Sequence, residues 1–239
     1  MNCGIILGAS SGIGNATYKK IKEEHPDLRI ITVDREKMDT TKNDIHYILD
    51  LSDENAVSIF IGELSDKDYK FKFIVNSVGY QENVDILDLD AKQWDEMYTT
   101  TVKSVFLIEQ FISKNMISND LNNKSIVNVV SIHSNIIRDI AHYSSSKASL
   151  EMITKELAYS LSKYNIRANS VLPGSIDTPL LRKDLQNEEM LKEASEQIPL
   201  LRHGEANEVA DLIIFLLSDK ATYITGSSIV IDGGLSLVI

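Results

Sequence analysis

The sequence is poor in cysteine, and its only one, Cys3, cannot form an internal disulfide. The five histidines do not cluster with Cys3 at metal-ligand spacing, which argues against a metal site. No apolar run approaches the ~20 residues that cross a bilayer, and the opening residues MNCGIILGASSGIG lack the basic start of a secretion signal. We therefore expect a metal-free, cytoplasmic protein without a membrane partner.

Basic residues are also in the minority. The chain has 24 Lys and Arg against 35 Asp and Glu, a formal net charge of −11 at pH 7, which repels nucleic acid phosphates and anionic lipids. No repeat, low-complexity tract or proline-rich linker divides the 239 residues. We expect one domain spanning residues 1–239 and no nucleic acid as a partner.

Short apolar segments alternate with longer segments of helical periodicity, the pattern of a parallel sheet covered by helices. Several strands are apolar throughout, as expected when helices cover both faces. The pattern predicts an α/β fold of the Rossmann type, a doubly wound parallel sheet of about seven strands. The predicted strands are CGIILG, RIITVD, IHYILD, FKFIVN, SIVNVV, RANSVL and SSIVID, and the predicted helices span residues 12–25, 54–64, 91–116, 142–163 and 205–218.

One segment, residues 178–203, departs from this alternation and contains a short amphipathic helix with apolar ends. Excursions of this kind beyond a strand often cover a ligand site. We expect this one to cover the substrate.

The first strand leads into GASSGIG, with Gly8, Gly12 and Gly14 at the turn into a helix. Glycines let the backbone approach a pyrophosphate, and the amides of a helix start attract its charge. The spacing is not the usual G-x-G-x-x-G, and such a turn can serve packing alone. Its position before a second strand that ends in Asp34 favours a dinucleotide site.

Asp34 bears on the choice of cofactor. A carboxylate at the end of the second strand can accept hydrogen bonds from the adenosine ribose and would repel the extra phosphate of NADP. Ser11, where a cation could have held that phosphate, also favours NAD. Arg35, beside Asp34, could instead attract that phosphate, so NADP remains an alternative cofactor.

The chain resembles the compact, single-domain short-chain dehydrogenases/reductases over essentially its whole length. Five motifs in order carry the resemblance: GASSGIG, NSVG at residues 76–79, Ser131 followed by YSSSK, PGSIDT at residues 173–178, and ITGSSIVIDGG near the end. It implies a homotetramer in which the helices at residues 91–116 and 142–163 pair between subunits, and the apolar ending LSLVI is compatible with a second interface.

The resemblance also implies the cofactor contacts. Asp50 and Leu51 would flank the adenine, the backbone of Ile176 would meet the nicotinamide carboxamide, and Thr178 would reach towards it or the pyrophosphate. The full set of expected cofactor residues is Gly8, Ser10, Ser11, Gly12, Ile13, Gly14, Asp34, Arg35, Asp50, Leu51, Asn76, Ser77, Gly79, Tyr143, Lys147, Pro173, Gly174, Ile176 and Thr178.

Tyr143 and Lys147 lie one helical turn apart, after a strand that ends in Ser131. We predict that Tyr143 is the general acid/base, that the Lys147 ammonium lowers its pKa and holds the ribose, and that Ser131 donates a hydrogen bond to the substrate oxygen. The Tyr18–Lys22 and Tyr159–Lys163 pairs share the spacing but lack this setting, so we expect both on the solvated surface.

Several alternatives remain open around this group. Ser134 is nearer to Tyr143 in sequence and could replace Ser131, and His133 or His142, with Asp139, could supply a base. The family usually has an asparagine of a proton relay where this chain has Thr101. We keep Thr101 as a candidate catalytic residue.

The first hypothesis for function is an NAD-dependent oxidoreductase that interconverts a secondary alcohol and a ketone, with a small-molecule alcohol or carbonyl as substrate. The second is an NADPH-dependent 3-oxoacyl-carrier-protein reductase, although a basic docking patch is represented only by scattered residues such as Lys124, Arg138 and Lys163. The third, which Thr101 favours, is a dinucleotide-binding regulator that has lost catalysis.

Overall fold

The computed structural model describes residues 1–185 and 187–239, and its centre is a seven-stranded parallel sheet. The strands are β1 (Asn2–Leu7), β2 (Arg29–Asp34), β3 (Ile45–Ile48), β4 (Lys70–Asn76), β5 (Lys124–Val129), β6 (Ile166–Pro173) and β9 (Ser228–Ile231). Their order is β3-β2-β1-β4-β5-β6-β9, so the winding reverses between β1 and β4. Open α/β sheets bind ligands at such a reversal. The predicted fold class is confirmed, and each predicted strand lies within two residues of its observed bounds.

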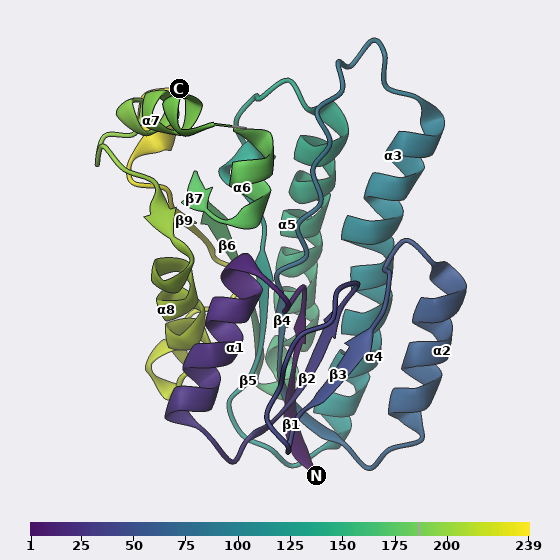
Figure 1. Cartoon of the computed structure of the whole chain (residues 1–239). Helices are drawn as coiled ribbons and strands as arrows, with labels where there is room; N and C mark the ends of the chain where they lie inside the picture. The colour runs from purple at the N-terminus through teal and green to yellow at the C-terminus, as the bar shows by residue number, and fades with distance from the viewer. Residues whose placement is uncertain (186) are drawn as a thin grey trace.

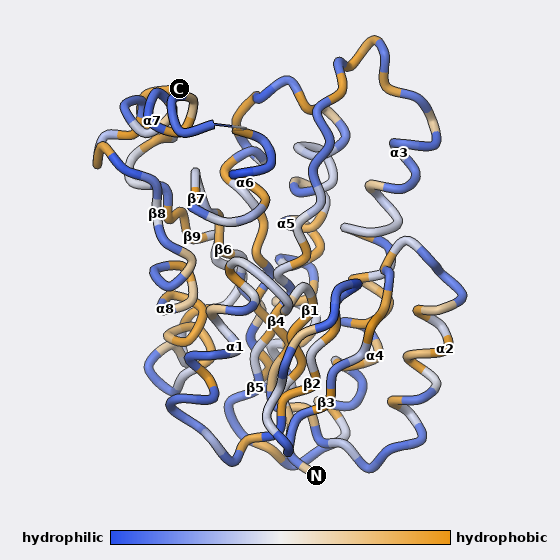
Figure 2. Tube along the Cα trace, viewed as in Figure 1, coloured by the Kyte–Doolittle hydropathy of each residue, from blue (hydrophilic) through white to orange (hydrophobic). Residues whose placement is uncertain are grey.

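Helices cover both faces of the sheet (Figure 1). α1 (Gly12–Glu24) and α8 (Ala206–Leu217) lie on one face, and α2 (Glu54–Ser65), α4 (Ser104–Ser118) and α5 (Ala141–Leu161) lie on the other. Because side chains alternate along a strand, Ile5 and Leu7 enter the core under α2, α4 and α5, whereas Ile6 enters the core under α1 and α8. Figure 2 shows the resulting concentration of hydrophobic residues along the strands.

The helix predicted over residues 91–116 is interrupted. It consists of α3 (Ala91–Tyr98), a π-helical turn (Thr99–Lys103) and α4, with the N–H of Ser104 donating to the carbonyl of Thr99. Such π-helical turns are frequent at functional sites.

The excursion at residues 178–203 contains two helices, α6 (Pro179–Asp184) and α7 (Glu188–Glu196), so the prediction of one helix is wrong. Thr178 and Asn187 cap them through their side chains, since their oxygens accept the N–H groups of Leu181 and Met190. The two ends of the excursion are joined by a short parallel pair, β7 (Ile176–Asp177) and β8 (Gly204–Glu205).

Glu109 on α4 is a carboxyl group with no exposed surface. Neither of its oxygens has a hydrogen-bond partner among the described residues. Burial raises the pKa of Glu109 to about 8, and the nearby Asn128 amide offsets only part of the rise. Asn128 is already bonded to Asn76 and Thr154. Glu109 is therefore protonated at neutral pH.

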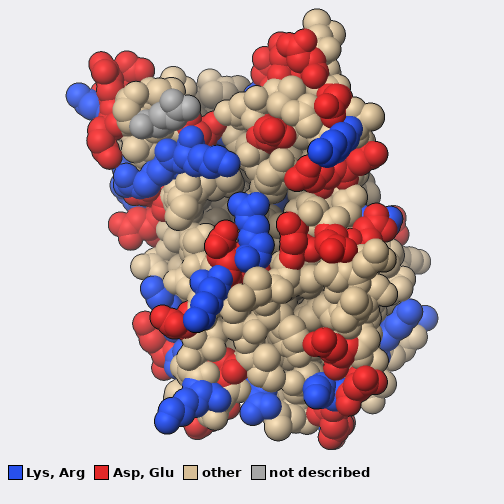
Figure 3. Space-filling model, turned by 45° about the vertical axis from the view of Figure 1, so that its right-hand side comes forward, with Lys and Arg blue, Asp and Glu red and all other residues tan. Residues whose placement is uncertain are grey.

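Acidic and basic side chains are interspersed on the face shown in Figure 3, where acidic groups flank the basic ones around a central hollow. In the described part of the chain, no helix is long and apolar enough to span a bilayer, and no group of three or more potential ligands could hold a metal ion.

Candidate active site

The turn between β1 and α1 leaves no room for a side chain at Gly8 or Gly14. Gly8 has a φ of +74°, and an added Cβ would lie 2.7 Å from the carbonyl oxygen of Ser77. A Cβ on Gly14 would lie 1.9 Å from the carbonyl oxygen of Gly8, so α1 packs directly on the turn. Ser11, the residue before α1, makes no side-chain cap, which leaves the first amides of the helix available to an anion. Gly14 itself does not line the cavity beside this turn, whereas Gly8 and Gly12 do.

The carboxylate of Asp34, at the end of β2, faces the same cavity as the glycine turn. The N–H of Ser10 donates to its Oδ2 at 2.9 Å, and the N–H of Glu36 donates to its Oδ1 at 3.1 Å. A carboxylate has about four acceptor positions, so capacity remains for ribose hydroxyls. Ser10, Ser11, Ile13 and Arg35 also line the cavity, as predicted.

Asp50 and Leu51 form the next part of the wall. Ser52 donates both its N–H and its hydroxyl to Oδ1 of Asp50, each at 2.8 Å. The Leu51 carbonyl accepts a hydrogen bond of 2.7 Å from the buried Ser104 hydroxyl. The turn is thereby held against α4.

Asn76, predicted as part of the loop that supports the cofactor, does not itself line the cavity. It is fully buried, donates to Oδ1 of Asn128 at 2.9 Å and accepts the N–H of Val78 at 3.1 Å. Asn76 therefore shapes the following loop, of which Ser77 and Gly79 reach the cavity.

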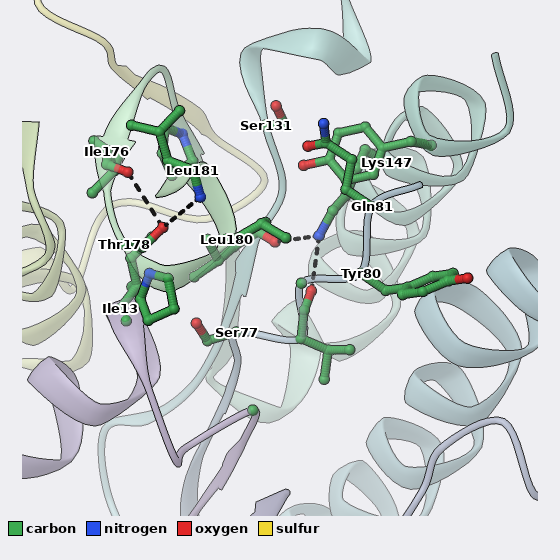
Figure 4. A pocket seen from close by; sticks show the side chains of 18 of the residues that line it. Ile13, Ser77, Tyr80, Gln81, Ser131, Lys147, Ile176, Thr178, Leu180 and Leu181 are labelled. Carbon is green, nitrogen blue, oxygen red and sulfur yellow. Dashed lines mark hydrogen bonds between the residues drawn. The ribbon is translucent and has the colours of Figure 1, made fainter. Parts of the chain in front are cut away.

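Tyr143 and Lys147 lie on the first two turns of α5 and face the cavity. The Nζ of Lys147 donates to the carbonyl oxygens of Val78 and Val129 at 3.0 and 3.1 Å (Figure 4). It lies 5.8 Å from the centroid of the Tyr143 ring. Burial lowers the pKa of Lys147 to about 8.

The pKa of Tyr143 differs from the expectation. Burial raises it above its ordinary value, and the groups that oppose the rise are the Ser131 hydroxyl and the Arg138 guanidinium rather than Lys147. Desolvation of the phenolate therefore outweighs the effects of Ser131 and Arg138.

Ser131, which follows β5, lines the cavity. Its Oγ accepts the N–H of His133 at 3.1 Å, so its own hydrogen is free to be donated. Ser134 does not line the cavity, because its hydroxyl contacts the Ser131 carbonyl at 2.9 Å and Oε2 of Glu151 at 2.6 Å. The alternative in which Ser134 replaces Ser131 is therefore wrong.

Comparisons with known proteins agree with this geometry. A family model described as enoyl-(acyl carrier protein) reductase matches residues 8–236. The chain is 33% identical to a 3-oxoacyl-[acyl-carrier-protein] reductase of Thermotoga maritima, over 97% of this chain and 96% of the relative. The chain belongs to the short-chain dehydrogenase/reductase family.

Other relatives in the family have different stated substrates. The chain is 32% identical to a glucose 1-dehydrogenase of Gluconobacter oxydans, over 98% of this chain and 91% of that protein. The structure of 4-hydroxyisoleucine dehydrogenase complexed with NADH matches with a TM-score of 0.91 at 27% identity, over 99% of both chains. This short-chain dehydrogenase/reductase is thus an oxidoreductase acting on CH–OH groups with a nicotinamide dinucleotide.

Thr101, which replaces the usual asparagine of the family, lies in the π-helical turn. It is 1% exposed, and its hydroxyl donates to Sδ of Met97 at 3.5 Å. Its neighbour Thr100 lines the cavity, whereas Thr101 does not. The Thr101 hydroxyl is thus engaged outside the cavity, and a catalytic role for Thr101 through its backbone carbonyl stays a prediction.

The end of β6 and the segment after it place Pro173, Gly174, Ile176 and Thr178 along the cavity. A Cβ on Gly174 would lie 2.6 Å from Cβ of Asp232, so glycine is required there. The Thr178 hydroxyl donates to the Ile176 carbonyl at 3.3 Å and caps α6 (Figure 4). The Thr178 hydroxyl would have to give up its hydrogen bond to Ile176 before it could donate to a cofactor.

The whole cavity has a volume of about 560 Å³, and residues of the excursion form part of its wall. Leu180, Leu181 and Leu185 contribute apolar surface. Asp184 accepts hydrogen bonds from Arg138 and Asn83 and so joins α6 to the loops after β5 and β4. Arg138 and Asp184 are cavity residues without a sequence motif, because the fold alone brings them together.

The structure gives the alternative histidine base little support. Burial and the Arg138 charge lower the pKa of His133 to about 4, so this cavity residue is neutral at pH 7. His142 is fully buried and does not line the cavity. Asp139 does not line it either.

The two other Tyr–Lys pairs lie outside the cavity. Tyr159 is 84% exposed and Lys163 is exposed, as predicted. The prediction for Tyr18 and Lys22 is wrong, because Tyr18 is buried, Lys22 is half-buried and both donate to Asp44, at 2.8 and 3.2 Å.

Proposed function

We propose that the protein is an NAD-dependent oxidoreductase that interconverts a small secondary alcohol and its ketone. The observation that carries the proposal is one cavity with Asp34 beside the glycine turn at one end and Tyr143, Lys147 and Ser131 at the other.

The chain fits a nicotinamide dinucleotide. Gly8 and Gly14 let the turn pack closely against its own backbone, and the start of α1 supplies free amides to a pyrophosphate. When bound, the cofactor accepts or supplies the hydride. Asp34, oriented by two amides, suits ribose hydroxyls and opposes a phosphate on them, which supports NAD over NADP.

Tyr143 exchanges the substrate proton at its phenol oxygen. It would take the hydroxyl proton of an alcohol during oxidation and return it to the ketone oxygen during reduction. Lys147 is held by hydrogen bonds to the loop after β4 and to the end of β5, and it places an ammonium beside the ring. Because burial raises the pKa of Tyr143, we expect the charge of a bound nicotinamide to contribute much of the lowering that catalysis needs.

Ser131 would donate its free hydrogen to the substrate oxygen while Tyr143 exchanges the proton. The electrostatic effect is largest where charge builds on that oxygen in the transition state. Its hydroxyl is suited to this because its lone pair, rather than its hydrogen, is engaged by His133.

Reduction of 3-oxoacyl groups on a carrier protein is the activity named for the Thermotoga maritima relative, and it is the second candidate. The surface gives it little support. Of the basic residues considered for docking an acidic carrier, Lys124 is buried against two backbone carbonyls and Arg138 is paired with Asp184. Lys163 is the exposed one.

We also propose that the chain assembles as a homotetramer. Apolar side chains on α4 and α5, Phe106 and Met152 among them, are exposed, as are Leu237 to Ile239 at the chain end. Light scattering tests the mass, and a monomer at micromolar concentration would contradict this assembly.

A panel of secondary alcohols and ketones tests the function, with NAD and NADP compared in parallel through the absorbance of the reduced cofactor. We expect turnover of at least one small pair with NAD preferred. Activity confined to acetoacetyl thioesters with NADPH would instead favour the carrier-protein reductase.

A further inference from the structure

Glu151 continues the row of functional side chains on α5. It lies one helical turn beyond Lys147 and two beyond Tyr143, on the same face of the helix. It is 7% exposed and does not line the cavity. A buried carboxylate in this row requires a structural explanation, because burial of an unpaired charge is costly.

Donors from three parts of the fold meet this carboxylate. Oε2 accepts from the Ser134 hydroxyl at 2.6 Å and from Nδ2 of Asn135 at 3.1 Å, both in the loop after β5. Oε1 accepts from Nζ of Lys155 on α5 at 2.7 Å and from the Ser228 hydroxyl on β9 at 2.8 Å. Burial alone would raise the pKa of Glu151, but Lys155, Ser134 and Ser228 together lower it to about 2.

The loop held by Glu151 is the one that carries Ser131. Ile132–Ser134 form a single 3-10 turn, in which the N–H of Ser134 donates to the Ser131 carbonyl at 3.1 Å. The preceding amide of the same turn, that of His133, donates to Oγ of Ser131 at 3.1 Å. Ser134 has one hydroxyl hydrogen, and the shorter contact to a charged acceptor favours the carboxylate. Fixing Ser134 therefore restrains the turn whose amide engages the Ser131 hydroxyl.

We propose that Glu151 is a positioning residue that holds the Ser131 hydroxyl in register with Tyr143 by tying the loop after β5 to α5 and β9. The inference rests on the proposed function, since it assigns Glu151 a part in the same reaction. The role needs a carboxylate in particular, because each oxygen receives two donors. An amide of the same shape would turn its NH₂ group towards one pair of donors in either orientation.

The test compares Glu151→Gln with a matched control, Glu156→Gln, because Glu156 is an exposed glutamate of the same helix without a role in the loop. We expect Glu151→Gln to lower kcat by about 10- to 100-fold, the scale of misplacing a catalytic group. The Kd for NADH should stay within about 2-fold, and Glu156→Gln should keep nearly full kcat.

The pH profile separates positioning from general loss of structure. The Ser131 hydroxyl lowers the pKa of Tyr143, so loosening Ser131 should move the acidic limb of alcohol oxidation to higher pH. Ser131→Ala should move the limb in the same direction. In that background Glu151→Gln should add little, because the two residues act as one unit. Ser134→Ala, a smaller perturbation, should reproduce the shift if Glu151→Gln folds poorly.

If Glu151→Gln kept full kcat and the acidic limb of its pH profile did not move, this inference would be overturned. The proposed function would still stand if Tyr143→Phe were inactive in the same assay. If the wild-type protein turned over no substrate, the proposed function would fail on its own. Hydrogen exchange of residues 131–136 would then decide the role of Glu151. We expect faster exchange in Glu151→Gln than in Glu156→Gln. Equal exchange in the two variants would overturn the proposal that Glu151 holds this loop.

Discussion

Replacing Glu109 by glutamine should stabilise the protein, although the residue lies in its core. The substitution keeps the shape and removes the ionisable group. The unfolded chain loses this proton near the ordinary pKa of 4.5, whereas the folded protein retains it to about pH 8. An acid whose folded pKa is raised makes stability fall with pH between those two values. At about 1.4 kcal/mol per pH unit, the cost to the wild type at pH 7 is about 3 kcal/mol.

Urea unfolding at pH 5, 6, 7 and 8, at one protein concentration, measures this effect. The stability advantage of Glu109→Gln should be small at pH 5 and grow towards pH 8. Glu156→Gln, on the exposed side of α5, should stay within about 0.5 kcal/mol of the wild type throughout. A Glu109→Gln advantage that does not change with pH would refute the reasoning, because it would show that the carboxyl is not held protonated.

Two further substitutions test the cofactor end of the cavity. Gly14→Ala places a Cβ 1.9 Å from the Gly8 carbonyl and should weaken NADH binding at least about 10-fold in a fluorescence titration, whereas Gly62→Ala on α2 meets nothing within 4 Å and should leave the Kd unchanged. Asp34→Ser should lower the ratio of kcat/KM for NAD over NADP by about 10-fold or more, since one lost charged hydrogen bond is worth about 1.5 kcal/mol or more. Equal Kd values for the two glycine variants, or an unchanged cofactor ratio, would contradict the assignment of this end.

The sequence predicts the strands and most helices because their signals are local. β1, for instance, combines an apolar run with a glycine turn, and each signal needs only its own neighbours. The π-helical turn at Thr99–Lys103 has no such signal, since moving one hydrogen bond by a residue leaves the apolar pattern almost intact. Within this turn Thr100, rather than Thr101, lines the cavity.

The site residues divide in the same way. Gly8, Asp34 and Tyr143 follow from motif and position, and all three line the cavity. Asn76 also belongs to a motif, but its packing behind the loop depends on Asn128, 52 residues away. The contacts of Glu151 reach 17 residues back and 77 residues forward, so no sequence window contains them.

Tyr143→Phe measures the central claim, that the Tyr143 hydroxyl exchanges the substrate proton. The variant keeps the ring and its packing while removing the group that holds the proton. The account predicts that kcat falls roughly 10²- to 10⁴-fold, the usual contribution of a general acid/base, while the Kd for NADH stays within about 2-fold. Turnover close to that of the wild type, with NADH still bound, would contradict it.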